Sequence, residues 1–184
     1  MKAVLFRAHG GPDKLSYEDL PTPTIGPEDV LVRVKACALN HLDIWIRQGN
    51  PAYPMPLPHV TGSDVAGVVE QVGNRVEGVV VEQRVFVSPG ISCWKCEQCL
   101  AGRDNMCRSY GLIGAMKHGS YAEYVKVPFR NVLPIPENLS FEQAAAFPLV
   151  SVTASHMLFA LAGLQHGETV LIMGAGSGVG TMAI

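Results

Sequence analysis

The first 139 residues consist mainly of short segments in which apolar and polar positions alternate, separated by prolines and glycines. Residues 30–36 read VLVRVKA, and this alternation is typical of a strand with one face in the core and the other in water. Seven segments have this strand character. They are residues 1–7, 15–20, 30–39, 64–72, 84–88, 120–128 and 131–135. Short strands at such close spacing predict a compact, mainly β, barrel-like domain.

One short helix is predicted inside this β-rich part, at residues 40–48. Asn40 is a favourable N-cap, and Gly49 is the kind of residue that ends a helix in the left-handed conformation. Residues 51–58 follow with four prolines, which predict an extended and rigid loop.

The pattern changes near residue 140, where helical signals replace the alternating ones. Ser140 and Gln143 have the spacing of a capping box. Pro148 suits the first turn of a second helix, which we expect to reach about residue 164. The apolar run at residues 169–173 then predicts a short buried strand.

A glycine-rich turn, GAGSGVG, follows that strand at residues 174–180. Between a strand and a helical start, the backbone N–H groups of such a turn can hold the pyrophosphate of a dinucleotide. The candidate cofactor-binding residues are Gly174, Gly176, Gly178 and Gly180. The spacing is not a strict G-x-G-x-x-G, so a tight turn without a ligand is the alternative interpretation.

The overall composition argues against several classes of function. Hydrophobic residues make up 48% of the chain and charged residues 16%, so a sizeable core can form. A formal net charge of −2 provides no electrostatic attraction to nucleic acid or to acidic membranes. No apolar run approaches the roughly 18 residues of a membrane span, and the apolar start is too short for a signal peptide. We therefore expect a cytoplasmic protein with neither nucleic acid nor a membrane as partner.

Four cysteines lie within 15 residues at C-x2-C-x2-C-x7-C spacing. They are Cys93, Cys96, Cys99 and Cys107. Thiols in the cytoplasm stay reduced, so the cluster predicts one structural zinc ion bound by four thiolates in a lobe at residues 90–110. An iron–sulfur cluster and disulfides are the alternatives. The fifth cysteine, Cys37, is expected to be a small buried hydrophobic residue.

These features, in this order, resemble the medium-chain dehydrogenase/reductase superfamily, which includes zinc-type alcohol dehydrogenases and quinone oxidoreductases. Residues 62–69, GSDVAGVV, are similar to its G-H/T/S-E/D-x-A/S-G-x-V segment. Residues 119–124, GSYAEY, are similar to its G-G/S-Y/F-A-E-Y strand. One departure is EQR at residues 82–84, where the superfamily usually has GDR.

The resemblance implies both a fold and an activity. It implies a GroES-like catalytic domain at residues 1–139 that carries the zinc lobe, followed by connecting helices at residues 140–166. Residues 167–184 would be the first strand and glycine turn of a truncated α/β Rossmann domain. The resemblance further implies hydride transfer with NAD or NADP and a homo-oligomer, either a dimer or a tetramer. Because the Rossmann domain would be incomplete, we expect the chain alone to be inactive.

The catalytic metal site is the part of the resemblance that this sequence lacks. In members with catalytic zinc, the ligand positions correspond to Asn40, Ser63 and approximately Leu149, and none of these side chains is a good zinc ligand. Leu42 stands at the position of the hydroxyl residue that relays a proton. Residues 40–49, NHLDIWIRQG, instead resemble the N-x-x-D-x-Y-I-R-x-G segment of zinc-free quinone oxidoreductases.

Four residues of this segment are candidates for the site. We expect Asn40 to hydrogen-bond a substrate carbonyl, Asp43 to brace the start of the helix and Trp45 to line an apolar pocket. By the resemblance, His41 would face the cofactor phosphates. Alternatively, Asn40 is only a helix cap and Trp45 belongs to the core. A further alternative is an improvised metal site formed by His41, Asp43, His59 and Asp64.

The leading hypothesis is an NAD(P)H-dependent oxidoreductase that carries structural zinc only. It would transfer hydride to or from a quinone, an enone or another carbonyl or alcohol substrate. Such a transfer needs orientation and an electrophilic hydrogen bond, and a metal is not essential. The alternatives are a zinc-dependent alcohol dehydrogenase with an atypical catalytic site and a nonenzymatic, zinc-stapled binding module.

Overall fold

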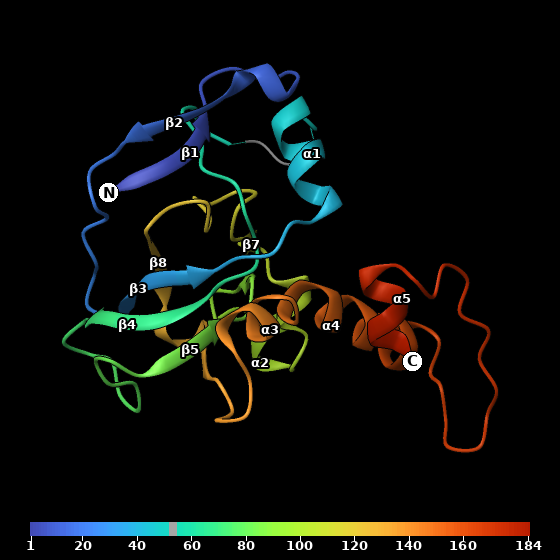
Figure 1. The fold of residues 1–184 in the computed structure, drawn as a ribbon. Coiled ribbons are helices and arrows are strands. Elements are labelled where there is room, and N and C mark those ends of the chain that lie inside the picture. The colour runs from blue at the N-terminus through green and yellow to red at the C-terminus, as the bar shows by residue number, and fades with distance from the viewer. Residues whose placement is uncertain (52–54) are drawn as a thin grey trace.

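The centre of the protein is a five-stranded sheet in which every pair of neighbouring strands is antiparallel (Figure 1). The structure is a computed structural model that describes residues 1–51 and 55–184. The strand order is β8-β3-β4-β5-β9. The strands are β3 (Asp29–Ala36), β4 (Ala66–Val72), β5 (Arg84–Val87), β8 (Tyr124–Pro128) and β9 (Val132–Pro134).

Two smaller antiparallel sheets accompany the central one. They pair β1 (Lys2–Phe6) with β2 (Leu15–Asp19), and β6 (Gly90–Ile91) with β7 (Gly111–Leu112). Strand β1 is attached to the chain that leads into β4, because Phe6 and His59 exchange two backbone hydrogen bonds. All seven predicted strands are confirmed, although β3 ends at Ala36 and β8 begins only at Tyr124.

Valine side chains supply most of the main core. Val125 and Val127 of β8 are buried on either side of the exposed Lys126, as the alternating pattern predicts. Val85 and Val87 of β5 are fully buried in the same cluster. Burying a valine side chain contributes about 1.5 kcal/mol or more, so this cluster of branched side chains stabilises the barrel.

The helices lie on different sides of the central sheet, and the last two extend beyond it (Figure 1). They are α1 (His41–Gln48), α2 (Glu97–Leu100), α3 (Phe141–Ala145), α4 (Pro148–Ser155) and α5 (Gly178–Ala183), with a π-helical segment η4 (His156–Leu161) and the 3-10 turns η1 (Pro12–Lys14), η2 (Asp104–Met106) and η3 (Phe129–Asn131). Helix α1 follows Asn40 and ends at Gly49, whose φ is +89°. The capping box of α3 also forms, since Gln143 N–H donates to Ser140 Oγ at 3.2 Å and Ser140 N–H donates to Gln143 Oε1 at 2.9 Å.

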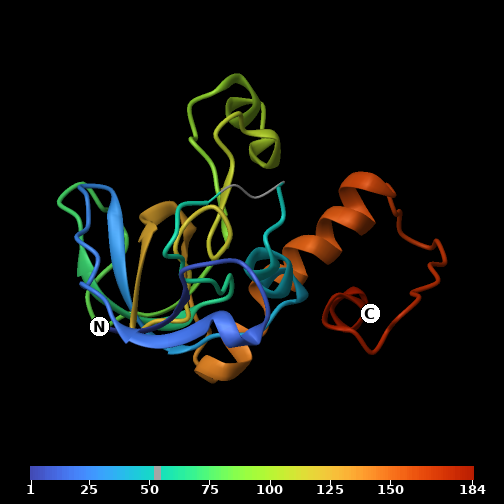
Figure 2. The ribbon, with the colours of Figure 1, turned by 90° about the horizontal axis from the view of Figure 1, so that it is seen from above.

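The strand expected at residues 169–173 does not form, and this prediction is wrong. Leu171 and Met173 are 85% and 88% exposed, and the segment loops away from the barrel before it returns to α5 (Figure 2). A short apolar strand is stable only where neighbouring strands take up its backbone hydrogen bonds. None of the described strands lies beside this segment, so its apolar side chains stay in water.

Two further expectations concern the loops. Cys37 is exposed rather than buried, because β3 has already ended at Ala36 and its alternation no longer directs the next side chain into the core. Of the proline-rich loop at residues 51–58, residues 52–54 lie outside the described residues, and residues 55–58 form neither helix nor strand.

Within residues 1–51 and 55–184, no helix is both long enough and apolar enough to cross a bilayer.

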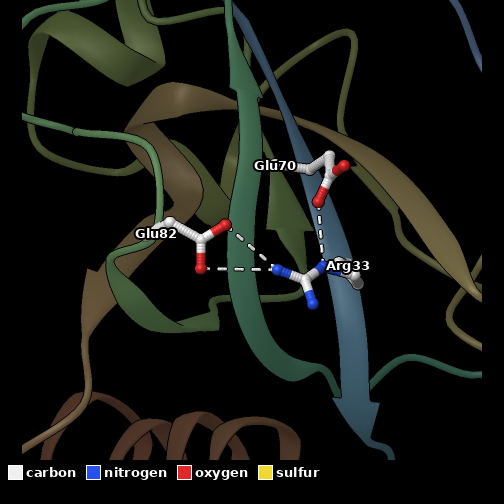
Figure 3. A network of polar contacts seen from close by, with 3 residues as sticks. All are labelled: Arg33, Glu70 and Glu82. Carbon is white, nitrogen blue, oxygen red and sulfur yellow. Dashed lines mark hydrogen bonds and ion pairs between the residues drawn. The ribbon is translucent and has the colours of Figure 1, made fainter.

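An ion-pair network includes Glu82, the first of the departing residues at 82–84. Arg33 of β3 lies between two carboxylates, with its Nε 2.8 Å from Glu70 Oε2 and its Nη2 3.1 Å from Glu82 Oε1 (Figure 3). Glu82 has φ of +65°, in the left-handed region that costs a residue with a side chain about 1 kcal/mol. Glycine, the usual superfamily residue there, avoids this cost but cannot contact Arg33. Glu82 therefore combines an unfavourable backbone with a favourable ion pair.

We predict that Glu82→Gly changes the melting temperature less than Glu82→Ala does. Both variants lose the pair with Arg33, but only glycine relieves the left-handed backbone. Thermal unfolding at low and at high salt measures this, because salt screens the exposed ion pair and not the backbone conformation. Glu82→Asn, which tolerates left-handed φ better than alanine, should fall between the two. A larger loss for the glycine variant than for the alanine variant would contradict the prediction.

Candidate functional site

The four clustered cysteines converge in a lobe that projects from the barrel (Figure 2). Their sulfur atoms all lie within 4.8 Å of one another. The Cys96–Cys99, Cys93–Cys99 and Cys96–Cys107 sulfur pairs are 3.5, 3.9 and 4.0 Å apart. Tetrahedral zinc with bonds of about 2.3 Å places its sulfur ligands roughly 3.8 Å apart. The residues present therefore fit one zinc ion, as predicted.

Backbone N–H groups donate hydrogen bonds to cysteine sulfurs in this lobe. The N–H groups of Cys93 and Ser109 donate to Cys107 Sγ at 3.3 and 3.4 Å. Backbone hydrogen bonds from Cys99 and Arg108 lower the pKa of Cys96 to about 6, whereas desolvation raises the pKa of Cys99 in the absence of the metal charge. Because zinc binds the thiolate and not the thiol, such donors favour the ligand form of the cysteine. All four ligands would be protein sulfurs, which leaves no position for a reactant and makes the site structural.

We predict one zinc ion per chain, lost on replacement of a cluster cysteine. Cys99→Ser should reduce the zinc content to near zero and lower the melting temperature, because the ion holds the lobe closed. Elemental analysis of the purified chain, combined with thermal unfolding, measures both effects. Cys37→Ser is the matched control. Because Cys37 lies outside the cluster, this variant should keep the full zinc content. A zinc content that survives Cys99→Ser would contradict the assignment.

A second group of interacting residues surrounds the buried carboxylate of Asp64, which is 1% exposed. Asn40 Nδ2 donates to Asp64 Oδ2 at 2.7 Å, and the backbone N–H of Leu149 donates to Asp64 Oδ1 at 2.8 Å. Burial raises the pKa of Asp64. Ser63 is the neighbouring residue, and its buried Oγ has no hydrogen-bond partner among the described residues. Two of the three positions that by resemblance correspond to catalytic-zinc ligands, Asn40 and Leu149, thus share Asp64 as a partner, which sequence reasoning did not single out.

The carboxylate of Asp43 braces the start of α1, as expected. It accepts hydrogen bonds from the Asn40 N–H at 2.8 Å and from the Gly62 N–H at 3.2 Å. Two side-chain hydroxyls also donate to it, Thr61 Oγ1 at 3.0 Å and Tyr121 Oη at 2.7 Å. Burial and this contact raise the pKa of Tyr121, so its hydroxyl stays a donor. Asp43 is therefore a structural hub that fixes α1 and the segment before β4 together.

Trp45 and His41 lie on one exposed face of α1. Trp45 is 47% exposed, which contradicts the alternative that it belongs to the core. Its ring contacts the ring of His41 edge to face, with 4.9 Å between the centroids and 77° between the planes. The carboxamide of Asn40 is likewise more than a helix cap, because its Nδ2 is directed at Asp64. These side chains make α1 a mixed polar and aromatic surface.

The improvised metal site is not formed. Among the described residues, the four cysteines are the one group of three or more His, Cys, Asp or Glu side chains with metal-ligand geometry. His59 lies 3.1 Å from the Gly114 carbonyl through its Nε2, and its ring stacks on His118 at 5.3 Å. Burial lowers the pKa of His59 to about 4. His59 is thus a neutral core residue, 1% exposed, and not a ligand beside Asp43.

We predict that the chain loses stability as the pH falls from about 6.5 to about 4. In that range the unfolded chain takes up a proton on His59, whose usual pKa is about 6.5, while the folded chain does not. The loss is on the order of 3 kcal/mol at the lower limit. His118, whose pKa burial also lowers, acts in the same direction.

Urea unfolding at a series of pH values measures this loss, with His59→Gln as the comparison. Glutamine keeps a neutral N–H donor for the Gly114 carbonyl but cannot titrate, so the acid decline should be shallower. Parallel declines in the two proteins would show that His59 is not responsible.

The glycine-rich turn closes onto α5 without a preceding strand. Gly174 has φ of +74°, and Ser177 Oγ caps α5 by accepting the Gly180 N–H at 3.0 Å. A Cβ atom at Gly180 would lie 2.2 Å from the Gly174 carbonyl oxygen, and one at Gly178 would lie 3.1 Å from Val150 of α4. Glycine is therefore required here for close packing.

Gly176 differs from Gly178 and Gly180 because, as at Gly174, no atom lies within 4 Å of where its Cβ would be. This open backbone fits the approach of a phosphate group, and its role toward a cofactor stays a prediction.

Comparison with known proteins adds independent support to this arrangement. Residues 26–137 match the family described as the alcohol dehydrogenase GroES-like domain. The L-threonine 3-dehydrogenase of Rhizobium etli (strain CIAT 652) is 38% identical over 165 residues, which cover 88% of this chain and 47% of that protein.

Solved structures agree over the whole chain. The crystal structure of an NAD-dependent alcohol dehydrogenase has a TM-score of 0.94 at 52% identity, covering 100% of this chain and 53% of its own. The cobalt- and zinc-bound thermostable alcohol dehydrogenase from Pyrobaculum aerophilum has a TM-score of 0.90 at 37% identity, covering 100% of this chain and 55% of its own. The chain thus spans about half the length of the proteins it matches.

Proposed function

Because the chain belongs to the family of alcohol dehydrogenase GroES-like domains, we propose that its complete protein is a nicotinamide-dependent oxidoreductase with structural zinc only. In this proposal the β-rich domain at residues 1–139 binds the substrate. Residues 140–166 connect it to the nucleotide-binding part, whose first turn is at residues 167–184. The relatives named above are alcohol and threonine dehydrogenases, which supports the class of reaction.

The observation that carries the proposal is the hydrogen bond between Asn40 and Asp64. Asn40 is at a position where a metal ligand would be expected by resemblance, and instead its Nδ2 donates to the carboxylate of Asp64 at 2.7 Å. A carboxamide, a serine hydroxyl and an alkyl side chain make a poor ligand set for zinc. The described residues offer no second cluster comparable to the four cysteines. The chemistry of the side chains therefore favours a site that acts through hydrogen bonds.

The residues of this chain have separate tasks in the proposed reaction. Nδ2 of Asn40 has a second N–H, which would donate to a substrate carbonyl and polarise it. The half-exposed Trp45 ring would cover the apolar face of a quinone or enone. The bound nicotinamide supplies the hydride, and the glycines at positions 174, 176, 178 and 180 would lie against its phosphates. His41, whose ring contacts the Trp45 ring edge to face, would face the same phosphates.

A zinc-dependent alcohol dehydrogenase is the second candidate function. It is favoured by the cobalt- and zinc-bound relative and by the buried carboxylate of Asp64, an oxygen ligand in principle. The two candidates differ in metal stoichiometry, because the second needs an ion beyond the one in the cysteine lobe.

We predict that the complete gene product contains one zinc ion per subunit and oxidises NADH or NADPH with quinones or enones. Asn40→Ala should lower kcat roughly a hundredfold, as loss of a polarising donor does, while the zinc content stays the same. The measurements are elemental analysis and a substrate panel with both cofactors. Two zinc ions per subunit would favour the dehydrogenase with catalytic zinc, and absence of nicotinamide binding would favour a nonenzymatic module. The 184-residue chain alone should show no turnover.

Gel filtration with light scattering would test the predicted dimer or tetramer, and the cytoplasmic location stays a prediction.

A further inference from the structure

The Asp64 carboxylate joins two segments that are far apart in the sequence. Its Oδ2 accepts from Asn40 Nδ2 at 2.7 Å, and its Oδ1 accepts from the Leu149 N–H at 2.8 Å. Asp64 is 1% exposed, so water cannot replace either partner. Hydrogen bonds to a buried carboxylate are strong and directional, and breaking one leaves an unsatisfied polar group. The two contacts therefore fix the distance between the Asn40 side chain and the backbone at Leu149.

The second contact is at the start of the helix that leads toward the glycine turn. Leu149 is the second residue of α4, and the first N–H groups of a helix have no partner within it. A carboxylate at this end is also favoured by the helix dipole. One residue later, Val150 packs against Gly178, where an added Cβ would lie 3.1 Å from its side chain. Figure 1 shows α4 reaching from the barrel to α5.

We propose that Asp64 is a positioning residue that fixes the Asn40 carboxamide relative to α4 and the glycine turn. The proposal rests on the function proposed above, in which Asn40 polarises the substrate and the glycine turn holds the cofactor. With one N–H of Asn40 committed to Asp64, the amide plane is fixed and the direction of its second N–H is set. The second N–H of Asn40, which would donate to the substrate, is thereby held in a fixed direction relative to α4, the helix against which the glycine turn packs.

The structure distinguishes two substitutions of Asp64. Alanine removes both contacts, so α4 and Asn40 are released together. Asparagine can still accept the Leu149 N–H through Oδ1, but it would present its NH2 group to Asn40. Asn40 would then have to turn its carboxamide over and present Oδ1 to residue 64. Asp64→Asn therefore reverses the Asn40 amide while it keeps the anchor of α4.

The pair itself can be tested in the 184-residue chain by NMR of the Asn40 side-chain amide. One of its two protons should be shifted strongly downfield, because it is bonded to a carboxylate. The shift should disappear in Asp64→Asn and persist in the control Asp29→Asn, where the lost carboxylate accepts from the Gly26 N–H instead. An Asn40 amide without this shift in the wild-type chain would overturn the proposal, whatever the activity of the complete protein.

The positioning role can be tested by kinetics of the complete gene product. Asp64→Asn should lower kcat roughly tenfold to a hundredfold, as misplacement of a reacting group does, with KM for the nicotinamide and the melting temperature near wild type. Asp64→Ala should lower both kcat and the melting temperature. Unchanged kcat in Asp64→Asn, or a fall in melting temperature equal to that of Asp64→Ala, would overturn the proposal. Wild-type protein without any turnover would refute the proposed function and leave the NMR result to decide the Asn40–Asp64 contact.

Discussion

The candidate site depends on the hydrogen bonds that the buried carboxylate of Asp43 accepts. It is 8% exposed and accepts hydrogen bonds from three separate parts of the chain. Those parts are the start of α1, the segment before β4 and the Tyr121 ring that precedes β8. A buried carboxylate is tolerated only when such donors surround it, so each donor is held where the carboxylate needs it. Helix α1, which carries Asn40 at its start and Trp45 on its exposed face, is fixed to the barrel by this constraint.

The zinc lobe is built on a different principle. Its ligands come from a single stretch of 15 residues, and its elements are too short to be stable alone. The metal supplies the cohesion that a hydrophobic core supplies elsewhere. The lobe projects from the barrel and is separate in the chain from Asn40 and Asp64 (Figure 2). In the proposed function, the zinc of this lobe contributes to architecture, and the chemistry belongs to the hydrogen-bonded residues around α1 and α4.

The end of the chain shows what happens to an apolar pattern without partners. Residues 169–173 have the composition of a buried strand, yet Leu171 and Met173 remain in water. The turn after them nevertheless closes onto α5, because none of its contacts needs a sheet: Ser177 caps the helix, Gly180 lets it pack against Gly174, and Gly178 packs against Val150 of α4. Local hydrogen bonds form without a sheet, whereas a strand needs neighbours.

The same difference separates what the sequence determined from what only the tertiary structure decided. The seven strands before residue 140, the capping box at Ser140 and the cysteine quartet were predictable, because alternation, capping and ligand spacing act over a few residues. The sequence also indicated that Asn40 and Leu149 belong to one site, but only through resemblance. That Asp64 is their shared partner depends on contacts across 24 and 85 residues, which no local pattern encodes. The exposure of Cys37 was likewise decided by the tertiary structure, because the elements packed around a side chain determine whether it is buried.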